Sequence, residues 1–387
     1  MMSLRLVSLV IASLVLVSGC GIFKGKANKE NIEPPTELTD FEASVDVSKI
    51  WSAGIGDGER KLSLRQAPAI ADGRVFAASP DGLLTAVDAA SGKNLWEVES
   101  ELRWSGGPAV AEGTLVVGTL DGQVVAYNPD SGSERWRAEV SSEVISTPAV
   151  ARGLTIVRAI DGRVFAFAIT TGERRWVYDR GLPQLTLRGN ARPVIDNGSV
   201  YIGYDGGTVV ALKLEDGGVI WEQSIAEGEG KTELERIVDI DGDIVASGSE
   251  VFVAAFGSHV VSLDAGSGRT LWTRDMSVYG GVALAEGRIL VSDAAGTVWA
   301  LDRATGASQW RQDGLAHRSL TTPGIVGTHV VVGDFDGYLH WLTLDSGAIA
   351  ARERVARKPF RATPQVVGDT VYAVTTDGEL AAYRTAP

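Results

Sequence analysis

The sequence is poor in cysteine, with Cys20 alone among 387 residues, against 46 glycines and 13 prolines. One cysteine excludes an internal disulfide framework and a metal site built from several thiolates. Basic residues are also scarce, since 36 lysines and arginines face 49 aspartates and glutamates, for a net charge of −13. This deficit argues against binding nucleic acid or an anionic lipid surface, because phosphate binding depends on clustered positive charge. With 44% hydrophobic and 22% charged residues, the chain can still bury a large core and make many glycine turns.

A long apolar run is missing as well. The run from Leu6 to Val17 is too short for a permanent membrane-spanning helix. Two small residues then precede Cys20, so residues 1–19 have the anatomy of a secretory signal peptide. The motif VSGC, which ends at Cys20, resembles the lipobox of bacterial lipoproteins, whose signal is cut before a cysteine that becomes acylated. This resemblance implies a lipid anchor at Cys20, and Gly21 resembles the sorting signal for the outer membrane, with the folded part facing the periplasm.

An ordinary signal peptide with a chance cysteine is the alternative, and it would leave the chain without an anchor. Residues 20–45 consist of Cys20 followed by the polar stretch GIFKGKANKENIEPPTELTDFEASV, which shows little periodicity. This composition predicts a flexible tether with a root-mean-square reach of about 25–30 Å. The folded part would then work at some distance from the membrane.

From residue 46 onward the chain repeats itself. Two clear copies are GPAVAEGTLVVGTLDGQVVAYNPDSGSERW, which ends at Trp136, and GVALAEGRILVSDAAGTVWALDRATGASQW, which ends at Trp310. In each copy, apolar runs alternate with Gly, Asp-Gly or Ser/Thr-Gly turns, a pattern typical of four short strands joined by hairpins. The second turn occurs eight times, at Gly82, Gly122, Gly162, Gly207, Ser258, Gly296, Gly337 and Gly378.

The closing tryptophan occurs seven times, and Ala351 holds the eighth place: Trp51, Trp96, Trp136, Trp176, Trp221, Trp272 and Trp310. Because Trp51 precedes the first copy and the last copy lacks a closing strand, the first strand is expected to complete the last sheet. Residues 46–387 therefore predict an all-β fold, an eight-bladed β-propeller of four-stranded blades closed by its N-terminal strand. An aromatic residue at the same place in each blade indicates packing between sheets rather than a ligand platform.

The pattern A-x-D-x-x-[ST]-G-x-x-x-W, seen in AVDAASGKNLW and SLDAGSGRTLW, resembles the repeats of the quinoprotein dehydrogenases, which hold pyrroloquinoline quinone in eight-bladed propellers. This resemblance speaks to the fold alone, because function lies in sites grafted on a fold. Those enzymes are generally longer and commonly place a vicinal disulfide against the quinone, which one cysteine cannot form. We therefore predict no enzyme, no cofactor and no metal. A quinone-dependent periplasmic dehydrogenase and a propeller that binds another envelope partner are the alternatives.

The spacing between tryptophans reveals two insertions. The closing tryptophans are 40 residues apart from Trp96 to Trp136 and from Trp136 to Trp176, then 45 residues apart to Trp221 and 51 residues apart to Trp272. The extra residues fall between the closing strand of one blade and the inner strand of the next. Because these connections emerge on one face of a propeller, the two insertions are expected to be neighbours. Long loops on a rigid scaffold are where binding usually takes place.

The lipobox, the tether, the repeats and these insertions together resemble the BamB family of the outer-membrane β-barrel assembly machinery. The resemblance implies a non-enzymatic scaffold that binds the periplasmic POTRA domains of BamA, and through them the rest of the BAM complex. It also implies a role in the folding and insertion of outer-membrane proteins. Sheet edges would in addition offer nascent barrel chains a strand to pair with.

The first insertion reads GLPQLTLRGNARP, residues 181–193. Leu185 and Leu187 alternate with polar residues just before Arg188, and exposed apolar groups beside a guanidinium suit a protein interface. The residues alone leave a second interpretation open, in which both leucines tuck beneath their own loop and Arg188 is solvated. BamB proteins carry a similar Leu-x-Leu-Arg segment at their contact with BamA, so the resemblance favours the interface.

The second insertion contains ELERIVDIDGDIVASGSE, residues 233–250. Asp239 and Asp241 match an Asp-x-Asp pair of the same contact face in the family, and a solvated turn before a strand is the alternative. A calcium-loop pattern also begins at Asp239. Its sixth position, where such a loop needs glycine, is Ile244, and the following residues predict a strand, so we expect no calcium site.

Overall fold

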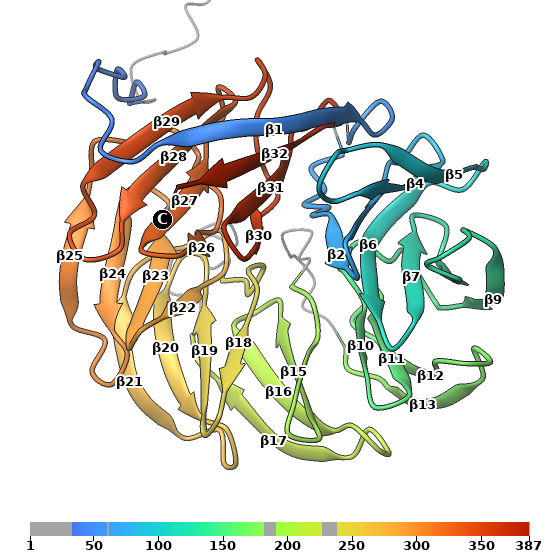
Figure 1. Cartoon of the computed structure of the whole chain (residues 1–387). Coiled ribbons are helices and arrows are strands. Elements are labelled where there is room, and N and C mark those ends of the chain that lie inside the picture. The colour runs from blue at the N-terminus through green and yellow to red at the C-terminus, as the bar shows by residue number, and fades with distance from the viewer. Residues whose placement is uncertain (1–32, 60–61, 182–190, 227–237, 387) are drawn as a thin grey trace, which may run out of the picture. The chain divides into compact units, whose positions relative to one another are not determined.

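The structure, a computed structural model, describes residues 33–59, 62–181, 191–226 and 238–386. Cys20 and the predicted signal peptide lie outside these residues. Pro35–Pro387 form one compact unit. Its strands make eight four-stranded antiparallel sheets around a ring (Figure 1), which confirms the predicted eight-bladed β-propeller. The described part of the chain contains no helix with the length and apolar character that a membrane crossing requires.

Seven blades consist of consecutive strands that run outward from the centre of the ring. Blade 1 contains β2 (Ala69–Ala71), β3 (Arg74–Ala78), β4 (Leu83–Asp88) and β5 (Asn94–Glu99). Blade 2 contains β6 (Trp104–Ala111), β7 (Thr114–Thr119), β8 (Gln123–Tyr127) and β9 (Glu134–Glu139). Blade 3 contains β10 (Ala149–Ala151), β11 (Leu154–Arg158), β12 (Val164–Ala168) and β13 (Arg174–Tyr178). Blade 4 contains β14 (Val194–Asp196), β15 (Ser199–Tyr204), β16 (Thr208–Lys213) and β17 (Val219–Ser224).

The second half of the ring follows the same plan. Blade 5 contains β18 (Val245–Ser247), β19 (Glu250–Ala254), β20 (His259–Asp264) and β21 (Thr270–Asp275). Blade 6 contains β22 (Ala283–Ala285), β23 (Arg288–Ser292), β24 (Val298–Asp302) and β25 (Ser308–Gln312). Blade 7 contains β26 (Gly324–Val326), β27 (His329–Gly333), β28 (Tyr338–Thr343) and β29 (Ile349–Arg354). Blade 8 contains β30 (Gln365–Val367), β31 (Thr370–Val374), β32 (Glu379–Thr385) and β1 (Val47–Gly54).

The burial of each strand follows its place in the blade. Second and third strands, such as β7 and β12, are buried along their whole length, because neighbouring blades cover both faces of the sheet. Their sequences are accordingly unbroken apolar runs. Outer strands such as β9 expose most of their residues and bury the tryptophan. The core is therefore a series of apolar layers between blades.

The N-terminal strand closes the ring, as predicted. β1 pairs antiparallel with β32, in a register that runs from Val47 opposite Thr385 to Gly54 opposite Glu379. Blade 8 thus takes its outermost strand from the start of the folded region and its other three strands from the end. Unfolding of either end opens the ring.

The closing tryptophans join adjacent blades. In seven blades, the indole Nε1 donates a hydrogen bond of 2.7–3.0 Å to a backbone carbonyl of the next blade. The indole also packs against the glycine in the turn between the third and fourth strands of that blade, such as Gly132 beside Trp96. A Cβ on this glycine would lie 2.7 Å from Trp96 Cε3. The tryptophans are therefore inter-blade packing groups, as the sequence predicts.

The eighth place, Ala351, has a topological explanation. Blade 8 receives its fourth strand from the N-terminus, so it has no turn between third and fourth strands on which a tryptophan of blade 7 can dock. Most other blades have an alanine on the third strand opposite the tryptophan on the fourth, such as Ala86 opposite Trp96. Blade 7 has the reverse arrangement, with Trp341 on β28 opposite Ala351 on β29. Trp341 is fully buried, and its Nε1 donates to Thr385 Oγ1 of blade 8 at 3.0 Å. The inter-blade link is preserved from a different strand.

Substitution of Gly132 tests this docking. Gly132→Ala is expected to lower the free energy of unfolding by at least about 2 kcal/mol, because a left-handed conformation and a clash with Trp96 add. Gly113→Ala is the matched control, since Gly113 has a similar positive φ but open space around its Cβ. The control should lose only about 1 kcal/mol in urea denaturation. Equal losses in the two variants would refute a packing role for the indole.

Part of the predicted tether lies on the ring. Thr36 N donates to Ala316 O at 3.0 Å, and Ser44 N donates to Ala350 O at 2.8 Å. Leu38 packs against the core between blades 6 and 7, and Phe41 lies under the guanidinium of Arg352, 5.0 Å from the ring centroid. We call residues 35–46 the strap. Because the strap lies on the ring, only the part of the predicted tether before residue 35, about half of it, can act as a tether.

Candidate partner-binding face

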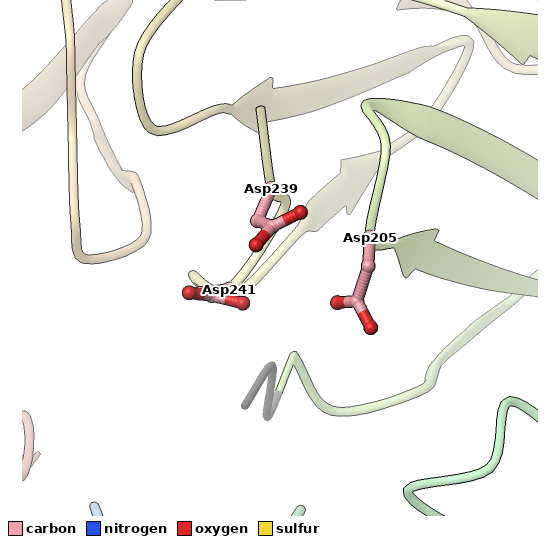
Figure 2. Close-up of side chains that lie close together, drawn as sticks. All are labelled: Asp205, Asp239 and Asp241. Carbon is pink, nitrogen blue, oxygen red and sulfur yellow. The ribbon is translucent and has the colours of Figure 1, made fainter. Parts of the chain in front are cut away.

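The candidate site lies on the face where chain connections pass from one blade to the next. The turns between second and third strands reach the same face, so a connection can contact the turns of two blades. Asp205 occupies such a turn, between β15 and β16 of blade 4, and Asp239 and Asp241 lie in the connection that leads to β18 of blade 5. Figure 2 shows the three carboxylates converging from these two segments. One oxygen from each lies within 4.8 Å of the others.

Asp239 is a backbone bridge between blades 4 and 5. It pairs with Asp205 on one side and with Phe256 on the other, and Phe256 N donates to Asp239 O at 2.9 Å. Its Oδ1 accepts a hydrogen bond of 3.1 Å from Gly206 N, and its exposed fraction is 2%. The structure thus places this predicted surface residue in the support of the face, where it holds the connection in register.

Asp241 is the more accessible member of the predicted pair. Its side chain is half-buried and lines the cavity at the ring centre, about 470 Å³, together with Arg65 and Arg192. Burial raises the pKa of Asp241 to about 6, against the attraction of Arg65, and the nearby Asp239 and Asp205 add to the rise. Near neutral pH this carboxyl carries a charge that depends on its neighbours.

Arg158 compensates the buried charge of Asp205. Arg158 ends β11 in blade 3, is 3% exposed, and its Nη2 lies 3.6 Å from Asp205 Oδ1. Burial raises the pKa of Asp205, and Arg158 opposes that rise. The guanidinium also packs over the ring of Tyr204 at 5.1 Å. Asp205 thus has a cationic partner inside the cluster, and Asp239 accepts a hydrogen bond from Gly206 N, so we assign these two carboxylates to the framework of the face.

Arg158 also supports the first insertion. Its Nη1 donates to Ala191 O at 3.4 Å, and Ala191 is the first described residue after the insertion's central part. Leu185, Leu187 and Arg188, the residues predicted to bind a partner, lie outside the described residues, so their roles stay predictions.

The two insertions meet, as the spacing of the tryptophans predicts. Arg192, at the end of the first, forms an ion pair with Asp243 of the second, with Nε and Oδ2 3.3 Å apart. Glu250, the twelfth residue of the calcium-loop pattern, lies instead on β19 and forms an ion pair with Arg303 at 2.8 Å. The residues of that pattern therefore serve separate contacts.

Sequence reasoning missed Arg158, although the repeats carry a signal for it. It ends a second strand in a column of the repeat where the other blades have uncharged residues: Ala78, Gly118, Gly203, Ala254, Ser292, Gly333 and Val374. A single guanidinium in a buried column indicates a special contact, because an arginine is almost never buried without a partner. Its partner Asp205 lies in the next blade, two residues after the position of the same column, Gly203.

Comparisons with known proteins identify the family. The family model described as outer membrane protein assembly factor BamB matches residues 50–101 and 80–312. The protein of that name from Xanthomonas campestris pv. campestris is 45% identical, over 98% of this chain and 97% of its own length. Those from Pseudomonas aeruginosa and Escherichia coli K12 are 41% and 32% identical, over 97% and 94% of this chain and 97% of their own lengths.

Solved structures agree on the fold. BamB from Moraxella catarrhalis superposes with a TM-score of 0.80 at 24% identity, covering 88% of this chain and all of that one. The quinohemoprotein alcohol dehydrogenase from Comamonas testosteroni superposes with a TM-score of 0.69 at 14% identity, covering 88% of this chain and 76% of that one, a likeness of fold alone. On the near full-length identity to its relatives, the chain belongs to the BamB family of outer-membrane protein assembly factors.

Proposed function

We propose that this assembly factor is a lipid-anchored scaffold that holds the periplasmic POTRA domains of BamA on the face described above. In this proposal Cys20 carries the anchor in the outer membrane, the ring faces the periplasm, and binding to BamA connects it to the BAM complex. The scaffold would orient the POTRA domains and raise the local concentration of nascent barrel chains, without chemistry of its own.

The meeting of the two insertions is the observation that supports this proposal. Arg192 and Asp243 join them directly, and Arg158 connects blades 3 and 4 beneath them. A loop surface tied down at several points loses little conformational entropy when a partner binds. Leu185, Leu187 and Arg188 precede Ala191 and Arg192 in the sequence of the first insertion, and Asp239 and Asp241 belong to the described end of the second.

Binding of the full chain, extracted in detergent, to purified POTRA domains tests the proposal. Leu185→Asp and Arg188→Ala are each expected to weaken binding at least tenfold, because apolar and guanidinium groups at the centre of an interface carry most of its energy. Leu95→Asp and Arg311→Ala are matched controls, since both side chains are exposed on outer strands of other blades.

The controls should bind like the wild-type chain, and all five proteins should give the same circular dichroism spectrum. Absence of saturable binding by the wild-type chain would overturn the proposal. Equal binding by all variants would keep the partner and move the site away from the first insertion.

A further inference from the structure

The connection between β21 and β22 brings an aromatic side chain to the same face. Tyr279, in this connection, is 48% exposed. The exposed large hydrophobic side chains of the described residues include one other aromatic, Phe41, which the strap places against Arg352. An exposed tyrosine ring on a loop is the kind of group that protein interfaces use as an anchor.

Tyr279 is contiguous with the predicted Asp-x-Asp segment. Its ring stacks on Phe256, with centroids 4.3 Å apart and planes 20° from parallel. Phe256 in turn pairs with Asp239 through the backbone bond already described. Contacts therefore link the second insertion, through Phe256, to the connection between blades 5 and 6.

Arg65 holds the backbone of Tyr279 from a distant blade of the propeller. Its Nη1 donates to Tyr279 O at 2.8 Å, although the two residues are 214 positions apart in the sequence and belong to connections of blades 1 and 6. Arg65 also lines the central cavity with Asp241. The backbone of Tyr279 is thus fixed by a hydrogen bond while its ring is fixed by stacking, so the exposed ring is presented in one orientation. A partner that packs on a pre-ordered ring loses less entropy than one that must order it.

We propose that Tyr279 is a contact residue for the partner of this face, with Phe256 and Arg65 as the positioning residues that hold its ring ready. The partner is a protein surface that packs an apolar side chain on the tyrosine ring. This assignment rests on the proposed function and extends the contact from blades 4 and 5 to blade 6, beyond both insertions. The stacking on Phe256 covers one part of the Tyr279 side chain, and nearly half of the side chain stays exposed and available to a partner.

Binding of the full chain to POTRA domains, with Tyr279→Ala, tests the assignment. We expect affinity to fall about tenfold, as for a truncated interface anchor. Leu271→Ala is the matched control, because Leu271 is similarly exposed but lies on β21, the outer strand of blade 5. The control is expected to bind within twofold of the wild-type chain. Arg65→Gln should give an intermediate loss, since it frees the backbone of Tyr279 but keeps the ring.

A photocrosslinking amino acid at position 279 keeps an aromatic group there and is independent of any folding defect in the alanine variant. Crosslinks to the POTRA domains from position 279, and none from position 271, are expected. Wild-type binding that Tyr279→Ala leaves unchanged, or equal crosslinking from both positions, would overturn this assignment while the proposed function stands. Failure of the wild-type chain to bind would overturn both.

Discussion

Replacing Arg158 with alanine is expected to lower the free energy of unfolding by about 3–5 kcal/mol. The substitution leaves the carboxylate of Asp205 buried without the guanidinium that lies 3.6 Å away. It also removes the donor to Ala191 O and the group that packs over the ring of Tyr204. Urea denaturation followed by tryptophan fluorescence measures the loss.

Arg163→Ala is the matched control for this experiment. Arg163 lies in the same blade and forms ion pairs with Asp161 and Asp179, but these three side chains are 30–59% exposed. Exposed ion pairs contribute little to stability, so the control should keep the wild-type denaturation midpoint. Similar curves for the two variants would show that burial does not make Arg158 special.

The pH dependence of the Arg158→Ala variant has a definite sign. Burial raises the pKa of Asp205 in the folded chain, and Arg158 opposes the rise, so its removal raises that pKa further. The folded variant then binds a proton at Asp205 more readily than the unfolded chain does. Its stability deficit is expected to shrink as the pH falls toward the ordinary pKa of a carboxyl group.

The same substitution separates support of the face from contact with a partner. Arg158 is nearly fully buried, so it does not reach a partner itself. Under conditions where the variant is still folded, we expect weaker binding to POTRA domains, because Ala191 and the insertion that precedes it lose an attachment to blade 3. Binding that is unchanged in the folded variant would show that the insertion is positioned by its other contacts, such as the Arg192–Asp243 pair.

The ring could be predicted from the sequence because each blade repeats the same physical problem. A tryptophan on an outer strand needs a glycine in the next blade, and a tight turn needs its own glycine, so both recur from blade to blade. Even the exception at Ala351 follows from ring closure, since blade 8 lacks the turn that would receive the indole. The exchange with Trp341 was not foreseen, because it preserves the packed volume across a strand pair rather than at one position.

The face was predictable only in outline. Insertions show in the spacing of the repeats, and propeller topology places them together, as the Arg192–Asp243 pair bears out. The contact between Arg65 and Tyr279 joins two inter-blade connections and not two positions on the repeated strands and turns, so no column of the repeat reveals it. Asp239 and Asp241 share a motif but differ in burial: Asp239 is nearly fully buried and accepts a hydrogen bond from Gly206 N, whereas Asp241 lines the central cavity.

The strap escaped prediction for a different reason. Its residues are polar and aperiodic, which is typical of a tether, and its contacts use mostly backbone atoms. Arg318 Nη1 donates to Thr36 O at 3.1 Å, and Arg352 Nη1 donates to Thr39 O at 3.1 Å. Backbone carbonyls are the same in every sequence, so composition does not show that a surface of blade 7 is ready to receive them.

Beneath the strap lies a buried group of charges centred on Asp334, in the turn between β27 and β28. Asp334 Oδ2 accepts hydrogen bonds from Arg318 Nε at 2.8 Å and from His340 Nε2 at 3.0 Å. Its Oδ1 accepts from the backbone N–H groups of Asp336 and Tyr338, both at 2.9 Å. Burial opposes the charge of Asp334, but His340, the backbone N–H of Tyr338 and the guanidinium of Arg318 together outweigh burial, so the pKa of Asp334 is lowered.

Asp334→Ala is expected to lower the free energy of unfolding by about 3–5 kcal/mol, because it leaves the guanidinium of Arg318 buried without its carboxylate. The two backbone N–H groups and His340 lose their acceptor at the same time. Asp336→Ala is the matched control from the same turn. Asp336 also approaches Arg318, at 3.5 Å, but it is half-exposed, so removing it should cost much less stability.

Since Arg318 also donates a hydrogen bond to Thr36 O, the same variants test the strap. Cleavage of the strap by a glutamate-specific protease at Glu37 should accelerate in Asp334→Ala and not in the control. Equal denaturation curves for the two variants would refute a central role for the buried carboxylate, and unchanged cleavage would show that the strap is held by Leu38 and Phe41 instead.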